Sequence, residues 1–161
     1  VAEGLEVEPL DHRIPAFGYR LVEPDGRTLV PELLAEAGIE GPDVGRLRDA
    51  GRLRGVRLED VSIPRPGQRF AFVMDTAMCE GAEALADGAD LLVSECTYAD
   101  EDADLAEAYR HLTAGQAGAL AGVGGAEVLV LTHFSSRYPD VAPLAAQARA
   151  TAGPADPARR T

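Results

Sequence analysis

After Pro66-Gly67 the chain alternates regularly between two patterns, short apolar runs and longer stretches rich in alanine. The apolar runs are typical of buried strands and the longer stretches are typical of helices. We expect strands at 70–74, 90–95 and 127–132, and helices at 80–86, 113–121 and 142–150. Strands separated by helices of this length form a parallel sheet through right-handed crossovers. The chain is therefore predicted to be an α/β protein.

The segment before Pro66 has a different organisation. Alternating apolar and polar residues predict strands at 4–9 and 17–22, with His12 in the turn between them. From residue 23 to 67, Gly, Pro and Arg dominate, apart from a short helix expected at 29–37. We interpret 23–67 as an inserted, mobile arm within one partial domain that covers 1–161. Prolines in 151–161 predict a tail there.

Three predicted strands end in side chains that can do chemistry: Asp75, Glu95 and His133. The carboxyl ends of parallel strands meet at one edge of a sheet, where ligands of open α/β sheets bind. Imidazole and carboxylate groups are the usual ligands of a hydrolytic zinc ion, and His12, Asp75 and His133 supply such a set. A single His or Asp at a strand end is more often a cap or turn residue. These residues alone leave both interpretations open.

His111 precedes a predicted helix start, where Thr113 and Gln116 have the spacing of a capping box. Such capping leaves the His111 side chain free to face the same edge of the sheet. An imidazole beside a carboxylate such as Glu95 is suited to proton transfer, because its pKa lies near neutrality. We therefore expect His111 and Glu95 to act as a pair.

The net charge of −12 argues against nucleic acid as a partner, since phosphate binding requires local positive charge. The distribution of charge is uneven, however. A cluster of arginines lies within the predicted arm, at positions 46, 48, 52, 54 and 57. This cluster is either a solvated helix face or a set of phosphate contacts.

Other features of the sequence concern the location of the protein in the cell. The longest apolar runs fall far short of the roughly 20 residues that a membrane span requires. The first residues have neither the basic region nor the apolar core of a signal peptide, and they read as a chain entered midway. Cys79 and Cys96 are too few for a disulfide framework, so we expect buried free thiols in a cytoplasmic protein.

Six short motifs in order resemble the ribonuclease Z family, over most of the chain up to about residue 150. They are Pro9-Leu10-Asp11-His12, Phe17-Gly18-Tyr19-Arg20, Asp75-Thr76, Glu95-Cys96-Thr97, His111-Leu112-Thr113 and Thr132-His133-Phe134-Ser135-Ser136-Arg137-Tyr138. The resemblance implies the C-terminal half of a metallo-β-lactamase-type αββα sandwich with an inserted flexible arm.

The resemblance also implies roles at the site. Two zinc ions would occupy a complete site, with Asp75 bridging them, His12 on one and His133 on the other. His111, paired with Glu95, would donate a proton to the leaving oxygen, and Arg137 would contact a phosphate.

The substrate implied is precursor tRNA, cut just 3′ of the discriminator nucleotide to leave a 3′-hydroxyl for CCA addition. The arm would grip the tRNA away from the cut, and Gly41-Pro42 matches its Gly-Pro motif. By this interpretation the arm contacts RNA through a set of arginines, namely Arg46, Arg48, Arg52 and Arg54. The family further implies a homodimer.

The chain departs from the family pattern at Met74, Ser94 and Leu112, where Gly, His and Ser are usual. No His-x-His-x-Asp-His motif occurs, although in this family it supplies most of the remaining ligands. We therefore expect a missing N-terminal half as partner, inactivity of this chain alone, and aggregation through an uncovered sheet. Two alternatives remain: a non-catalytic tRNA-binding remnant, or a metallo-β-lactamase-fold hydrolase of a small molecule.

Overall fold

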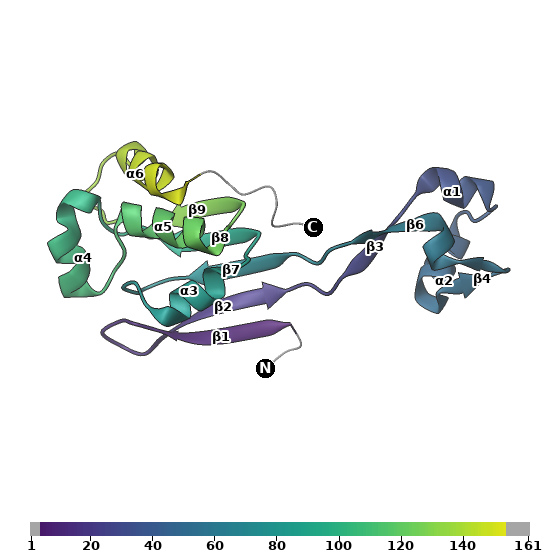
Figure 1. Ribbon diagram of the computed structural model, residues 1–161, viewed down its shortest axis with the longest axis horizontal. Coiled ribbons are helices and arrows are strands. Elements are labelled where there is room, and N and C mark those ends of the chain that lie inside the picture. Colours follow the sequence, from purple (N-terminus) through teal and green to yellow (C-terminus); the bar gives the residue numbers. More distant parts are fainter. Residues whose placement is uncertain (1–3, 154–161) are drawn as a thin grey trace. The chain divides into compact units, whose positions relative to one another are not determined.

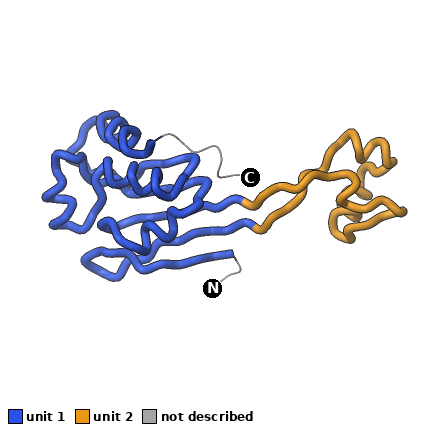
Figure 2. The backbone as a smooth tube through the Cα atoms, viewed as in Figure 1, with its two compact units in different colours: residues 1–23, 68–161 blue, residues 24–67 orange. Residues whose placement is uncertain are grey.

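The computed structural model describes residues 4–153. The chain divides into two compact units, coloured separately in Figure 2. The first, called the sheet unit below, joins the segment up to Glu23 to the segment from Gln68 onward. The second, the arm unit, is Pro24–Gly67.

The sheet unit is built on five strands in the order β1-β2-β7-β8-β9 (Figure 1). They are β1 (Leu5–Leu10), β2 (Ala16–Val22), β7 (Arg69–Val73), β8 (Leu91–Glu95) and β9 (Val128–Thr132). The predicted strands are confirmed within one residue at most ends, and β7, β8 and β9 are parallel as expected. β1 runs antiparallel to β2, to which a short connection joins it, and β2 runs antiparallel to β7. The sheet is therefore mixed rather than wholly parallel.

Among the described residues, four α-helices accompany this sheet: α3 (Glu80–Ala86), α4 (Ala103–Tyr109), α5 (Ala114–Gly124) and α6 (Ala142–Ala152). A 3-10 turn, η2 (Asp100–Asp102), leads into α4. Helices α3, α5 and α6 confirm the predictions, and the capping box of Thr113 with Gln116 is present. Helix α4 was not predicted. Within residues 4–153, no helix has the length and apolar character needed to cross a membrane.

Helix α6 also corrects the predicted tail, because the helix continues to Ala152, inside the segment 151–161. The part of that segment from 154 onward lies outside the described residues. The helix packs closely on α5, and glycine makes this approach possible. A Cβ atom at Gly118 would collide with the backbone oxygen of Ala148 and the hydroxyl of Thr151.

The core of the sheet unit lies on one face of the sheet, beneath α3 and α5. Ala71, Val73 and Leu92 point to this face and pack with Leu85 of α3 and Leu120 of α5. All five side chains are almost completely buried. The β7 residues therefore alternate between this core and the opposite face.

The opposite face of the sheet carries an uncovered apolar row. Val7, Tyr19, Phe72, Val93 and Val130 are cross-strand neighbours, one on each strand. Four of them are exposed, from 37% for Phe72 to 43% for Tyr19 and Val130, and Val93 is half-buried. Within the described residues, this sheet thus has one helix-covered face and one open apolar face.

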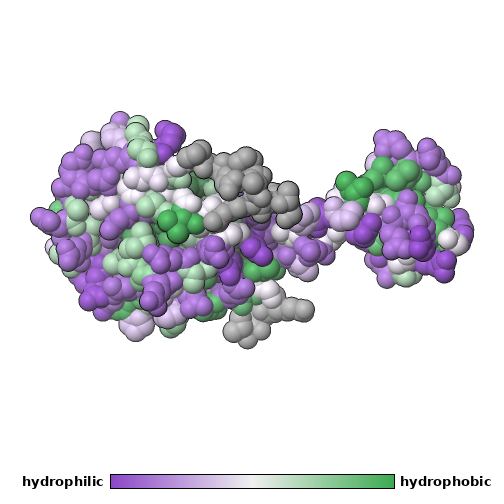
Figure 3. Space-filling model, in the orientation of Figure 1, coloured by the Kyte–Doolittle hydropathy of each residue, from purple (hydrophilic) through white to green (hydrophobic). Residues whose placement is uncertain are grey.

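The arm unit is a small fold with its own core. Its elements are β3 (Gly26–Leu29), α1 (Pro31–Glu36), α2 (Pro42–Ala50), β4 (Arg52–Leu53), β5 (Val56–Arg57), the 3-10 turn η1 (Leu58–Val61) and β6 (Ser62–Arg65). The helix predicted at 29–37 begins only at Pro31, because Leu29 pairs with Ser62 in β3–β6. Helix α2 was missed. Buried Leu34, Leu47 and Val61 form the core, and Figure 3 shows a hydrophobic patch among hydrophilic residues on this unit.

Candidate active site

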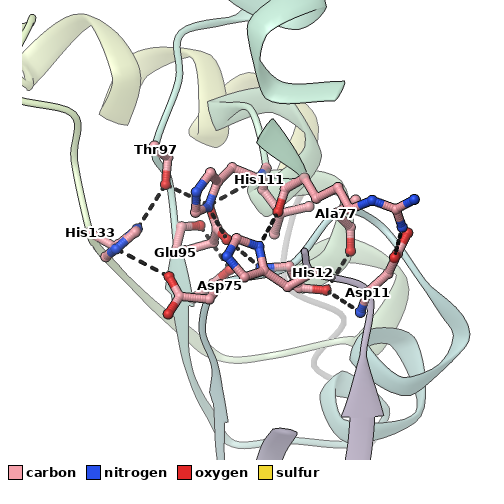
Figure 4. Close-up of polar contacts among 12 residues, drawn as sticks. Asp11, His12, Asp75, Ala77, Glu95, Thr97, His111 and His133 are labelled. Carbon is pink, nitrogen blue, oxygen red and sulfur yellow. Dashed lines mark hydrogen bonds and ion pairs between the residues drawn. The ribbon is translucent and has the colours of Figure 1, made fainter. Parts of the chain in front are cut away.

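Five predicted site residues converge at the carboxyl ends of the parallel strands (Figure 4). Asp75 follows β7, Glu95 ends β8 and His133 follows β9. His12 comes from the connection between β1 and β2, and His111 from that between α4 and α5. The ring centroid of His111 lies 4.9 Å from that of His12 and 5.3 Å from that of His133. The chain has only three histidines, so every one of them is here.

Glu95 is the fixed centre of this arrangement, with a fully buried side chain. Its carboxylate accepts the backbone N–H of Thr76 at 2.6 Å and that of Leu112 at 3.0 Å. It also accepts the Thr97 hydroxyl at 2.6 Å and Nδ1 of His111 at 3.0 Å. A carboxylate offers about four acceptor sites, and four donors fill them. Glu95 is therefore an orienting group rather than a metal ligand.

The hydrogen bonds fix which nitrogen of each histidine carries the proton. Nδ1 of His12 faces the backbone oxygen of Arg110 at 3.0 Å, and a carbonyl can only accept. Nδ1 of His111 faces a carboxylate, and Nδ1 of His133 faces the Thr97 hydroxyl, whose own proton goes to Glu95. All three rings therefore carry hydrogen on Nδ1, which leaves each Nε2 available to the site. This pattern is usual for metal-binding histidines.

Within this cluster, Asp75 and His133 have the spacing of a pair of metal ligands. Oxygen or nitrogen atoms of Asp75, Glu95, His111 and His133 all lie within 4.8 Å of one another. Nε2 of His133 is 3.2 Å from Oδ1 of Asp75. Two ligands at about 2.0–2.2 Å from a tetrahedral zinc ion are about 3.3–3.5 Å apart, so this pair is close to the required spacing. His12 lies outside the group of four, against the His111 ring.

Backbone strain is concentrated at the same place. Within residues 4–153, four residues other than glycine have positive φ, and Asp75 (51°), Arg110 (58°) and His133 (59°) are three of them. Such conformations cost on the order of 1 kcal/mol or more and gather at functional sites. Asp75 and His133 take this conformation just after β7 and β9, and Arg110 takes it at the end of α4.

The His12 connection is held from two sides. The backbone N–H of Asp11 donates to the Thr76 hydroxyl at 3.1 Å, and the Asp11 oxygen accepts from Ala77 at 2.8 Å. On the other side, the Arg110 guanidinium pairs with the Asp11 carboxylate while the Arg110 backbone oxygen receives the His12 ring. Sequence reasoning missed this function of Asp11 and Arg110, because no spacing rule links residues so far apart.

Arg137 borders the site. Its guanidinium lies 5.3 Å from the ring centroid of Tyr98 and 3.3 Å from Asp102, and its side chain is 42% exposed. Asp102 also accepts a hydrogen bond from the Tyr138 hydroxyl. That hydrogen bond, assisted by Arg137, lowers the pKa of Asp102, and burial raises the pKa of Tyr138. Arg137 is thus held at the rim, with Tyr98 close to the His111 ring.

The predicted RNA-contacting residues lie in the arm unit. Gly41 and Pro42 form the start of α2. Arg46 and Arg54 both pair with Asp43, at 3.1 and 2.8 Å, and Arg48 lies 3.7 Å from Asp49. Arg52 lies on β4. With seven arginines and eight acids in 24–67, this unit is nearly neutral, whereas the rest of the chain is strongly acidic.

No family model matches the chain. Curated relatives are close, however. The chain is 59% identical over 146 residues to ribonuclease Z of Streptomyces avermitilis, covering 91% of this chain and 48% of the relative. Ribonuclease Z of Kineococcus radiotolerans is 57% identical, covering 91% of this chain and 46% of the relative.

The chain belongs to the ribonuclease Z family. It spans about half the length of the curated relatives it matches. Ribonuclease Z of Streptomyces coelicolor gives the same proportions at 56% identity, with 91% of this chain and 48% of the relative covered.

Solved structures agree on the fold. The metallo-β-lactamase fold protein YhfI of Bacillus subtilis aligns with a TM-score of 0.56 at 18% identity, over 94% of this chain and 45% of that one. The short form of human tRNase Z aligns with a TM-score of 0.51 at 25% identity, over 84% of this chain and 38% of that one. The sheet unit therefore has part of the metallo-β-lactamase fold, as the resemblance implied.

Proposed function

We propose that this chain is part of a zinc-dependent endoribonuclease that cleaves precursor tRNA 3′ of the discriminator nucleotide. The observation that carries the proposal is the cluster of Asp75, His111 and His133 around the buried Glu95, with the ring of His12 against that of His111. Membership of the ribonuclease Z family gives this arrangement its substrate class. Zinc, when bound, supplies Lewis acidity that activates water and stabilises charge on a phosphodiester.

The residues of this chain would bind the metal, transfer a proton and contact the substrate. Asp75 and His133 would hold metal together, because Oδ1 and Nε2 lie 3.2 Å apart, and His12 would hold it through Nε2, because its Nδ1 is engaged by Arg110. His111 would act as the imidazolium: Glu95 accepts its Nδ1–H and stabilises the positive charge, so that Nε2–H can pass its proton to the leaving oxygen. Arg137, with its half-exposed guanidinium at the rim, would contact a phosphate of the substrate.

The activity would need the portion of the relatives that this chain does not match. His12, Asp75 and His133 would give at most two protein ligands for each of two zinc ions, and a catalytic zinc site commonly has three. The open apolar face of the sheet is where that N-terminal half would pack, giving the second layer of the αββα sandwich. Inactivity of the chain alone, a homodimer and a cytoplasmic location remain predictions of the resemblance.

The arm unit is the part of the chain that we propose binds tRNA. Its arginines are largely exposed, with side-chain exposures of 65–70% for Arg46, Arg48 and Arg54 despite their ion pairs. The Arg48–Asp49 pair is exposed on both sides and contributes about 0–1 kcal/mol, so a phosphate can replace Asp49 at little cost. Arg46 and Arg54, by contrast, share the mostly buried Asp43. A small-molecule hydrolase has no use for such a unit.

The test uses the chain produced together with the unmatched part of the Streptomyces avermitilis relative, called the reassembled protein below. Cleavage of an end-labelled precursor tRNA and bound zinc are both measured. His133→Ala should lose zinc and cleavage, whereas His111→Ala should keep zinc and lose cleavage by about 100-fold or more. Zinc retention by His133→Ala contradicts the ligand assignment. RNA binding without cleavage by the unaltered protein favours the non-catalytic remnant.

A further inference from the structure

Thr97 joins two parts of the site that are otherwise separate. Its side chain is nearly buried, at 7% exposure for the residue. The hydroxyl donates to Oε2 of Glu95 at 2.6 Å and lies 2.9 Å from Nδ1 of His133 (Figure 4). The single proton of this hydroxyl goes to the carboxylate, so the hydroxyl oxygen must accept the N–H of His133.

We propose that Thr97 is a positioning residue that sets the tautomer and orientation of His133. Through it, one buried carboxylate orients two histidines: Glu95 holds His111 directly and His133 by way of the Thr97 hydroxyl. Nδ1 of His133 is thereby kept protonated, and Nε2 is directed at Asp75, 3.2 Å from Oδ1. This inference rests on the proposed metal-dependent function, for which that nitrogen is a ligand.

His133 needs such support more than His111 does. The His133 side chain is 43% exposed and follows a strand end with left-handed backbone, so packing restrains the ring little. The His111 side chain is only 12% exposed, and its Nδ1 contacts both oxygens of Glu95, at 3.0 and 3.2 Å. Loss of the Thr97 hydroxyl should therefore affect His133 selectively.

The carboxylate itself would tolerate that loss. Without Thr97, Glu95 keeps the backbone N–H groups of Thr76 and Leu112 and the His111 ring. Three donors still satisfy most of its acceptor capacity, so the fold around Glu95 should persist. Thr97→Val removes the hydroxyl at nearly constant volume, and Thr97→Ser retains it.

The experiment measures ring-nitrogen NMR shifts of the histidines in the zinc-free reassembled protein, together with zinc affinity by competition with a chelator. In the unaltered protein, His133 should carry its proton on Nδ1. Thr97→Val should move His133 toward the Nε2-protonated form, leave His111 unchanged, and weaken zinc binding about 10- to 100-fold. Thr97→Ser should bind zinc within about threefold of the unaltered protein, because it keeps the hydroxyl.

The inference is overturned if Nδ1 of His133 in the unaltered protein carries no proton, a measurement that needs no variant to fold. It is also overturned if Thr97→Val leaves both the His133 tautomer and zinc affinity unchanged. The variant Asp75→Asn distinguishes a failure of the Thr97 inference from a failure of the proposed metal-dependent function. Loss of zinc in Asp75→Asn but not in Thr97→Val rejects only the role of Thr97. Zinc binding that survives Asp75→Asn, or failure of the two parts to associate, contradicts the proposed function itself.

Discussion

Phe72 lies directly opposite Tyr19 across the β2–β7 pair, and both rings are exposed on the face of the sheet that no helix of the described residues covers. Ala71 and Val73, which flank Phe72 on β7, are completely buried beneath the helices. A sheet with one finished face and one open apolar face is half of a layered fold. The chain covers only 48% of the Streptomyces avermitilis relative, and we propose that the unmatched part completes the fold.

Phe72→Asp should weaken association with the complementary part about 10- to 100-fold, because burying such a ring stabilises by about 1.5–3 kcal/mol. Titration of one part into the other, followed by light scattering, measures this. Val123→Asp is the matched control, since Val123 is 72% exposed on α5, away from the sheet. Equal binding by Phe72→Asp and the control would contradict the role of the open face.

The chain alone should aggregate, and a sharp, cooperative thermal transition would count against that.

Asp75→Gly should be more stable than Asp75→Ala by about 0.5–1 kcal/mol, although both lose the carboxylate. The left-handed backbone of Asp75 is costly for alanine and accessible to glycine. Urea unfolding of the zinc-free reassembled proteins gives the difference. Ala71→Gly, at an extended strand position, should instead destabilise. Greater stability of Asp75→Ala would show that no strain is stored there.

The two thiols should differ sharply in reactivity. Burial, reinforced by the charges of Glu95 and Asp100, raises the pKa of Cys96 to about 12, whereas Cys79 is half-buried. At pH 8 only about one Cys96 in ten thousand is a thiolate, so a thiol reagent should label one site per folded chain. Cys79→Ser should abolish that labelling, and denaturation should restore one reactive thiol. Labelling of folded Cys79→Ser would contradict the burial of Cys96.

Tyr138→Phe should destabilise the reassembled protein by about 1–2 kcal/mol at neutral pH, because the hydroxyl bonds the backbone N–H of Ala99 and the carboxylate of Asp102. The pKa of Asp102 is lowered in the folded state, so its contribution is present above the unfolded pKa and is lost as pH falls through the folded pKa. The deficit of the variant should therefore shrink below about pH 4.

Denaturant unfolding across pH measures this, with Tyr109→Phe as the control. Tyr109 is 43% exposed, and its ring contact with Arg13 survives the substitution. A deficit for Tyr138→Phe that stays constant from about pH 3 to about pH 7 would assign the effect to packing rather than to Asp102.

The sequence predicted the place of a residue in the fold correctly where that place follows from the secondary structure around the residue. Strand ends placed Asp75, Glu95 and His133 at one edge because parallel strands leave little choice. Helix α4 escaped prediction because it is short, and its start lies in a run of acids that also suits a loop. The functions of Thr97 and Arg110 depend on contacts across 36 and 98 residues, which no local pattern encodes.

The most direct measurement is cleavage of precursor tRNA by the reassembled protein with zinc, with the new 3′ end mapped to the nucleotide. The same assay is run on this chain alone, on the complementary part alone, and on the reassembled protein with His133→Ala. The account predicts a cut just after the discriminator nucleotide that requires both parts and His133. Cleavage that is unaffected by His133→Ala, or an associated and zinc-loaded protein that leaves the precursor intact, would contradict it.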